Sequence, residues 1–574
     1  MRTVVTDQGP KPSRAQTVPG KVSEKATTPS AAKTSPPRAA GEGAAAVAVA
    51  VVVAGAGAVD VRAGLVRAGP GALDGFAAGT AIPERVVALL SSLMQQRSSV
   101  ADLAAALRGE LERYSPGEKL PSSRTLVDRY HVSPVTVSGA LAALAREGLV
   151  ETRPGAGAYR AQSRRAVHAG GDTSWQEVAL SAEASPDLVP RSVDAGGVLA
   201  TLPEPPPGVI ELNGGYLPAG LRPERALAAA LARAGRRPGA WGRPPLEGMA
   251  ELRAWFAHEI SGGTGAVSAS EVLITAGGQS ALTTALRGLA PPGAAVLVES
   301  PTYPGMLGAA RASGLRPVPV PVDRDGVRPE LLARAFRASG ARVFVCQPLF
   351  QNPTGTVLAA DRRAAVLEAA RAAGAFVVED DFARRLAHSD AGPLSGTLRA
   401  DDPDGVVVHI NSLTKSTSPS LRVAALAARG PALERLRAIQ IVDSFFVPRP
   451  LQEAALELVG APAWARHLRT VAGELKVRRD AMLTALAREL PALSAPYVSR
   501  GGYQVWLRLP DGTDEAALVA AALRAGVAVA AGRPYFAAEA TAPYVRLSFA
   551  PAAGVAEIAE GVRRLRTAWD ETAA

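Results

Sequence analysis

A lysine among small hydroxyl residues is the side chain of this sequence best suited to covalent chemistry. Lys415 lies in the segment NSLTKSTSPSLR, with Ser412 before it and Arg422 at the end of the segment. The neutral amine of a lysine can form a Schiff base with a carbonyl compound, and a guanidinium can bind a phosphate through two parallel hydrogen bonds. The segment therefore predicts a lysine that holds a carbonyl cofactor, the alternative being an ordinary solvated lysine.

Further polar residues follow short apolar runs that are typical of strands. Asp380 belongs to a row of three acids at the end of one run, and a buried carboxylate needs a partner, for which a protonated pyridine nitrogen would serve. Gly278 and Gln279 follow another run and open a helix, whose backbone N–H groups can bind a phosphate. Asn352 begins a rigid Asn-Pro-Thr-Gly turn. A helix cap at Asp380 and a simple turn at Gly278 are the plainer alternatives.

Upstream, the chain has the pattern of a helix-turn-helix. Ser122 can cap a helix over 124–130, and Ser133 can cap the next helix, over 134–147, which has a proline at its first position. This pattern predicts a DNA-binding element, and the alternative is a helical cap without a nucleic-acid partner. The residues that the first turn of the second helix should expose toward base edges are Val135, Thr136 and Ser138.

A two-stranded wing is predicted after this element. Residues 149–152 and 158–160 can pair across a turn that contains Gly155. Arginines suit phosphates, which position a protein on DNA without reading its sequence. The arginines expected to contact phosphates are Arg124, Arg153 and Arg160.

Composition limits the classes of protein to consider. With 574 residues, 47% of them hydrophobic, the chain has room for roughly two to four domains. The net charge of +10 favours polyanionic partners. Cys346 is the only cysteine, which excludes an intrachain disulfide, fits a cytoplasmic setting, and with six histidines gives no zinc-binding spacing. The apolar stretch 43–59 is shorter than the roughly 20 strongly apolar residues of a spanning helix, so no membrane partner is expected.

Shifts in composition predict four segments. Residues 1–83 are rich in Ala, Pro, Gly and Thr, which predicts a disordered low-complexity tail. Residues 84–162 would form the winged helix-turn-helix, and residues 163–208, which are polar and Pro-rich, a linker. From 209 to 570, continuous apolar runs such as 272–275 alternate with helices, which predicts an α/β domain with a mostly parallel central sheet.

These motifs resemble two known families. Three sequence motifs together resemble the GntR-type winged helix: LPSSR at 120–124, VSPVTV at 132–137 and EGL…RPGAG at 147–157. The lysine, phosphate and acid motifs, in their order, resemble fold-type I pyridoxal-phosphate enzymes of the aspartate aminotransferase class. Their union in one chain resembles the MocR subfamily of GntR regulators, in which a winged helix is fused to an aminotransferase-like domain.

The second resemblance implies a role for each candidate site residue. Lys415 would bind pyridoxal 5'-phosphate as a Schiff base, Asp380 would hold the pyridine N–H, and Asn352 would donate to the ring hydroxyl. Tyr303 would stack on the ring, and Arg546 would bind the α-carboxylate of a ligand. The residues implied to bind the cofactor phosphate are Gly278, Gln279, Ser412 and Arg422.

Four positions depart from the family patterns. Phe382 stands in place of a tyrosine that usually donates to the ring hydroxyl, which predicts slow transamination. Pro134 and Ser138 stand where the GntR family often has arginine. Gly305 stands where some relatives hold a second carboxylate clamp, so a ligand with two carboxylates is not indicated.

The combined motifs predict a cytoplasmic transcription regulator that binds operator DNA. Its aminotransferase-like domain would sense pyridoxal phosphate or an adduct with an amino acid or amine. The alternatives are a working class I/II aminotransferase with an accessory DNA-binding module, and a structural remnant that binds neither DNA nor the cofactor. The resemblance also implies a homodimer, since residues of both subunits usually complete each site of a fold-type I protein.

Overall fold

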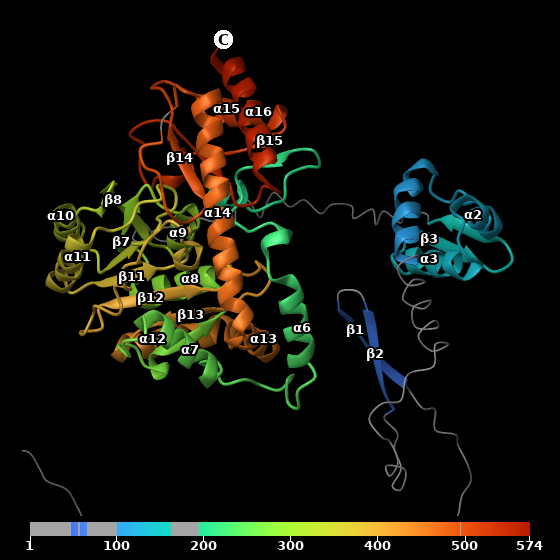
Figure 1. The fold of residues 1–574 in the computed structure, drawn as a ribbon, viewed down its shortest axis with the longest axis horizontal. Helices are drawn as coiled ribbons and strands as arrows, with labels where there is room; N and C mark the ends of the chain where they lie inside the picture. Colours follow the sequence, from blue (N-terminus) through green and yellow to red (C-terminus); the bar gives the residue numbers. More distant parts are fainter. Residues whose placement is uncertain (1–47, 56–57, 66–99, 162–194, 494, 574) are drawn as a thin grey trace, which may run out of the picture. The chain divides into compact units, whose positions relative to one another are not determined.

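The computed structural model describes residues 48–55, 58–65, 100–161, 195–493 and 495–573 (Figure 1). The chain divides into two compact units, Met1–Glu177 and Val178–Ala574. Within the described ranges, no helix is both long enough and apolar enough to cross a membrane.

Two strands lie in the N-terminal segment that the composition predicts to be disordered. β1 (Ala48–Gly55) and β2 (Ala58–Leu65) pair as an antiparallel hairpin. Valine-rich sequence favours extended backbone, as in these two strands, and the disordered tail stays a prediction. The rest of the predicted tail lies outside the described residues, as do residues 84–99 of the predicted winged-helix segment.

The remainder of the first unit has the elements of a winged helix-turn-helix. A helix over 100–110 carries Leu103 and Leu107 into the core, where they pack with the other buried apolar residues of this unit. Both predicted caps are present, since the side chain of Ser122 accepts the N–H of Thr125 and that of Ser133 accepts the N–H of Thr136, each at 3.1 Å. The later elements are η1 (Leu111–Arg113), α2 (Ser123–Tyr130), α3 (Pro134–Arg146), β3 (Val150–Arg153) and β4 (Gly157–Arg160).

The second unit is built on an eight-stranded sheet (Figure 1). Its strands are β6 (Val272–Thr275), β7 (Ala295–Ser300), β8 (Arg316–Asp323), β9 (Gly326–Val327), β10 (Val343–Cys346), β11 (Phe376–Asp380), β12 (Val407–Ser412) and β13 (Ala424–Ala427). They lie in the order β6-β13-β12-β11-β10-β7-β8-β9. Only β13 and β9 run antiparallel to their neighbours, so this sheet is mostly parallel, as predicted.

Helices cover both faces of this sheet because its strands are apolar on both sides. Val296 and Val298 of β7 pack in one core, whereas Leu297 between them packs in another. The helices of the first core are α8 (Gly278–Leu289), α9 (Pro304–Ala312) and α12 (Gly430–Ser444). Those of the opposite face are α7 (Ala250–Ser261), α10 (Pro329–Ser339), α11 (Ala360–Ala373) and α13 (Arg449–Gly460), with α6 (Glu224–Ala234) against α13.

The C-terminal part of this unit has a core of its own. The helix α14 (Pro462–Glu489) runs from the large sheet toward this part (Figure 1). Apolar residues of α14 pack there with those of a small antiparallel sheet. The remaining elements are β5 (Ile210–Glu211), β14 (Gln504–Arg508), α15 (Glu515–Arg524), β15 (Val527–Ala528), β16 (Ala530–Ala531), β17 (Tyr544–Ser548) and α16 (Val555–Ala573).

The end of the predicted linker is structured. A short helix, α5 (Gly196–Leu199), lies against α9 and against η5 (Arg533–Tyr535). The contact is close, since a Cβ added at Gly197 would lie 3.0 Å from Pro534 and 3.1 Å from Pro304. The predicted linker thus includes a packed helix near its C-terminal end, and its boundaries stay a prediction. Residues 163–194 of that segment lie outside the described residues.

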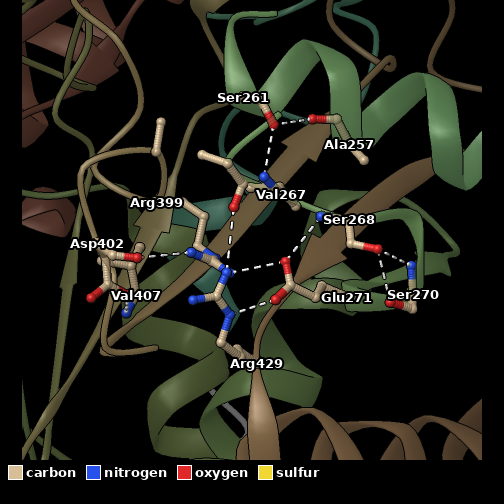
Figure 2. A network of polar contacts seen from close by, with 12 residues as sticks. Ala257, Ser261, Val267, Ser268, Ser270, Glu271, Arg399, Asp402, Val407 and Arg429 are labelled. Carbon is tan, nitrogen blue, oxygen red and sulfur yellow. Dashed lines mark hydrogen bonds and ion pairs between the residues drawn. The ribbon is translucent and has the colours of Figure 1, made fainter. Parts of the chain in front are cut away.

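A network of ion pairs joins Glu271, Arg399 and Arg429 (Figure 2), and Arg399 links it to the end of β11. Glu271, directly before β6, accepts hydrogen bonds from the guanidinium groups of Arg399 and Arg429. Arg399 is fully buried, and its backbone N–H donates to the carboxylate of Glu379 at 3.0 Å. Glu379 also contacts Nδ1 of His409 at 2.7 Å. These contacts hold in place the strand end that carries Asp380.

Candidate functional site

The carboxyl ends of five strands open into one cavity. β6, β7, β10, β11 and β12 run in the same direction, so the residues that follow them meet at one edge of the sheet, where ligands of open α/β sheets collect. The cavity has an empty volume of about 630 Å³. Its lining includes every predicted cofactor-site residue: Gly278, Gln279, Tyr303, Asn352, Asp380, Ser412, Lys415 and Arg422.

Lys415 lies in the turn after β12 and points into this cavity. Its Nζ donates to the carbonyl of Gly215 at 2.9 Å and lies 4.0 Å from the ring centre of Tyr216. Burial disfavours the charged ammonium and lowers the pKa of Lys415 to about 8. A lysine with such a pKa has a larger neutral fraction at neutral pH, which is the form that attacks a carbonyl group.

The turn between β6 and α8 forms a cradle for an anion. A Cβ at Gly277 would lie 2.5 Å from a guanidinium nitrogen of Arg422, so glycine is needed for the arginine to approach the first turn of α8. Ser412 lies beside Gly278. The side chain of Gln279, in the first turn of α8, donates to the carbonyl of Gly305 at 2.9 Å and is therefore engaged away from the cradle's other groups. Helix N–H groups, a hydroxyl and a guanidinium together suit a phosphate.

Asp380 ends β11, and Asn352 lies in the loop after β10; both line the cavity. Burial raises the pKa of Asp380 to about 6, while a hydrogen bond from Gln347 opposes this rise. An ionised Asp380 is therefore a strong acceptor for an N–H group of a ligand. Asn352 is 4% exposed, and its Oδ1 has no hydrogen-bond partner within the described part of the chain. Tyr303, between β7 and α9, lines the same cavity.

Arg546 lies behind the cavity on β17. Its guanidinium donates to the hydroxyl of Tyr535 at 2.5 Å and to the carbonyl of Gly214 at 3.3 Å. It is 3% exposed; burial lowers its pKa, and the neighbouring tyrosines, Tyr535 first, raise it. A buried guanidinium whose contacts are a hydroxyl and a carbonyl keeps its charge available for an anionic ligand.

Five residues of the cavity lining were not identified from the sequence: Tyr216, Leu282, Gln347, Thr414 and Tyr503. Tyr503 contacts Phe382 edge to face with ring centres 6.2 Å apart. Tyr216 follows Gly214-Gly215, and Tyr503 follows Gly501-Gly502. At these glycines the backbone approaches other groups closely. That pairing of two glycines before a tyrosine is the signal that could have indicated the two tyrosines.

The predicted DNA-contacting residues of the first unit are mostly exposed. Arg124, Ser138 and Gly155 are exposed, and so is Arg153, whose guanidinium lies 4.4 Å from the ring centre of Tyr159. Ser122 and Ser133 are also exposed while they cap their helices. These groups are accessible to phosphates or bases, and Arg153 also pairs with Glu151 at 3.3 Å.

Two predictions for this surface need correction or refinement. Thr136 was expected to be exposed, but it is 3% exposed and its hydroxyl lies 2.8 Å from that of Ser133. The hydroxyl turns back to the helix cap, so Val135 and Ser138 form the exposed part of this turn. Arg160 is half-buried and donates to the carbonyl of Tyr114, so part of its hydrogen-bonding capacity holds the wing in place.

Comparison with known proteins identifies both parts of the chain. The model of aminotransferase class I and II matches residues 208–565. The chain belongs to that family. The model of bacterial regulatory proteins of the gntR family matches residues 100–159. The chain therefore has the MocR architecture, in which a GntR-type DNA-binding module precedes an aminotransferase domain.

Some relatives of this chain are named as transcription regulators and others as aminotransferases. The HTH-type transcriptional regulator YdfD of Bacillus subtilis is 27% identical over 78% of this chain and 91% of its own length. The 2-aminoadipate transaminase of Thermus thermophilus is 34% identical over 62% of this chain and 89% of its own length. The crystal structure of LysN, an α-aminoadipate aminotransferase from the same organism, matches with a TM-score of 0.61 and 32% identity, covering 66% of this chain and 96% of that one. That structure is complexed with N-(5'-phosphopyridoxyl)-L-leucine.

Membership in this family implies pyridoxal 5'-phosphate as the cofactor, and the residues of the cavity fit it. The anion cradle at Gly278 suits the phosphate, and the buried carboxyl group of Asp380 in the lining can accept an N–H group of the ring. Lys415 supplies an amine for the carbonyl group. When bound, the cofactor supplies an electron-withdrawing ring, and protein groups orient it.

Proposed function

We propose that this protein is a transcription regulator that binds operator DNA and senses an amino acid or amine through its pyridoxal-phosphate site. The observation that supports it is that one chain carries exposed arginines on a winged helix and a cavity with all the predicted cofactor-binding groups. The regulator relatives, such as YdfD, match this chain over most of their length. A ligand at the cavity would then change the placement of the DNA-binding heads.

In this proposal each cavity residue holds one part of the cofactor. Asp380 accepts the pyridine N–H, Asn352 donates to the ring hydroxyl, and Tyr303 stacks on the ring. The amine of Lys415 would make the covalent bond to the cofactor and, when free, could hold a proton beside the ring. The phosphate is held by the N–H groups of Gly278 and Gln279 and by the side chains of Ser412 and Arg422.

The ligand class follows from the charges around the cavity. Arg546 would bind one carboxylate, with the hydroxyl of Tyr535 keeping its guanidinium oriented. The lining of the cavity itself is rich in aromatic rings, among them Tyr216, Phe382 and Tyr503. We therefore propose an amino acid with a single carboxylate, or an amine. Phe382 has no hydroxyl group, so it cannot donate a hydrogen bond to the ring hydroxyl of the cofactor. The slow transamination expected from this fits a sensor that retains its ligand.

We also propose that the protein is a cytoplasmic homodimer. Large apolar side chains are exposed on the second unit, including Trp241 at 81%, Val442 at 78% and Phe445 at 66%. Exposed apolar side chains of this size are common where a second chain binds. The oligomeric state measured by light scattering would test this, and a monomer at micromolar concentration would contradict it.

A working aminotransferase is the second candidate function. It is favoured by Lys415 and Asp380 in the lining of one cavity, by Arg546 with its guanidinium carbon 5.7 Å from the ring centre of the lining residue Tyr503, and by the identity of 34% to a transaminase. Purified protein distinguishes the two candidates. A specific footprint upstream of a neighbouring operon, with slow or undetectable conversion of amino donors and keto acids, supports the regulator. Fast turnover without a specific footprint supports the enzyme.

A further inference from the structure

One glutamine contacts both ring-binding groups of the cavity. Gln347 directly follows β10 and is 6% exposed. Its Nε2 donates to Oδ2 of Asp380 at 2.7 Å, and its Oε1 accepts the backbone N–H of Asn352 at 3.0 Å. Its own backbone N–H donates to Oε2 of Glu299 at 3.0 Å. No step of the proposed function uses this residue.

We infer that Gln347 is a positioning residue that keeps Asp380 as a hydrogen-bond acceptor and ties its position to that of Asn352. This inference rests on the roles of Asp380 and Asn352 given under the proposed function. The two ends of an amide are not equivalent, because the oxygen only accepts and the nitrogen only donates. Since the oxygen of Gln347 is committed to the N–H of Asn352, its nitrogen must face Asp380. Oδ2 of Asp380 is then occupied as an acceptor, which leaves Oδ1 for the pyridine N–H.

The surroundings of Gln347 support an ionised Asp380. Burial raises the pKa of the nearby Glu299 to about 8, so this carboxyl group is mostly protonated at neutral pH. Glu299 therefore adds little negative charge beside Asp380. The hydrogen bond from Gln347 lowers the pKa of Asp380, against the effect of burial. A carboxylate held in this state can stabilise a protonated ring nitrogen, on which the electron-withdrawing property of the ring depends.

Two substitutions separate the two links of Gln347. Gln347→Leu keeps a similar volume and removes both hydrogen bonds of the side chain. Gln347→Glu can still accept the N–H of Asn352, but it sets a carboxylate oxygen against Asp380. It therefore removes only the hydrogen bond to Asp380. Gln351→Leu is a matched control, because this glutamine lies in the same loop and its side chain bonds to Pro301, Thr354 and Glu299 but to neither Asp380 nor Asn352.

The experiment measures binding of three ligands to the full-length protein freed of cofactor. The ligands are pyridoxal phosphate, an analogue with carbon in place of the ring nitrogen, and an analogue without the ring hydroxyl. Wild type should prefer the natural cofactor over both analogues. Gln347→Leu should reduce both preferences by about tenfold, since each reflects hydrogen bonding to or near a charged group. Gln347→Glu should reduce only the preference that depends on the ring nitrogen, and Gln351→Leu should change neither.

The outcomes distinguish this inference from the function on which it rests. If Gln347→Leu weakens all three ligands by one common factor, Gln347 only supports the fold and the inference is overturned. If both Gln347 variants keep the preferences of wild type, it is overturned as well. If wild type itself does not discriminate between the cofactor and the analogue without the ring nitrogen, the role proposed for Asp380 is wrong, and the proposed function is contradicted rather than the inference on Gln347 alone. Should Gln347→Leu not fold, the comparison of Gln347→Glu with wild type still decides.

Discussion

The reactivity of Lys415 should depend on pH in a way that an exposed lysine cannot reproduce. Burial of its amine lowers the pKa from the ordinary 10.5 to about 8, because the charged ammonium loses its hydration. At pH 7 about one tenth of the Lys415 amines would then be neutral, compared with about one in three thousand for an amine with a pKa of 10.5. The rate of covalent attachment to pyridoxal phosphate should therefore level off above pH 8.

This prediction is tested with the cofactor-free protein between pH 6 and pH 10. Attachment is stopped at intervals with borohydride, and the pyridoxyl group is quantified on the peptide of Lys415 and on that of Lys119, an exposed reference lysine. The rate at Lys415 should rise about tenfold per pH unit up to about pH 8 and then stay constant. A rate at Lys415 that keeps rising to pH 10 would refute the argument from burial.

Three further predictions follow from individual residues. Arg124→Ala should weaken binding to all DNA sequences alike and flatten the dependence of log affinity on log salt by about one unit, measured by fluorescence anisotropy; a changed base preference would show that Arg124 reads sequence. Phe382→Tyr should lower by about one unit the pH at which the absorbance of the bound cofactor changes, and identical titrations would mean that another residue supplies the donor. Ser133→Ala should reduce the unfolding free energy of the winged helix by about 1 kcal/mol in urea denaturation, and no change would show that the cap hydrogen bond at 3.1 Å contributes nothing.

The parts of the fold that were predicted from the sequence are those in which local chemistry decides the structure. The runs 272–275 and 343–346 are continuously apolar and coincide with β6 and β10. Ser122 and Ser133 cap their helices because a short side-chain oxygen before a helix satisfies a free N–H group. Asp380 and Ser412 end their strands, so the residues that line the cavity could be identified from their place after apolar runs.

The sequence did not indicate features that depend on tertiary contacts. β8, with the sequence RPVPVPVD, looks unlike a strand because of its prolines. These prolines alternate, so their missing N–H groups lie on one edge while the intervening valines can pair with β7 on the other. Tyr216 contacts Lys415 although 199 positions separate them, and no local sequence pattern predicts that contact. Thr136 is buried because its hydroxyl has a closer partner in Ser133 than in solvent.

The central claim is that a ligand at the Lys415 cavity controls binding to DNA. Its most direct test is the affinity of the full-length protein for the genomic fragment it selects, measured with cofactor alone and with cofactor plus candidate amino acids. The account predicts that one amino acid with a single carboxylate changes the affinity or footprint of wild type, and that Lys415→Ala and Arg546→Gln abolish this change while still binding DNA. An affinity and footprint that no amino acid or amine alters, in a protein shown to carry pyridoxal phosphate on Lys415, would contradict it.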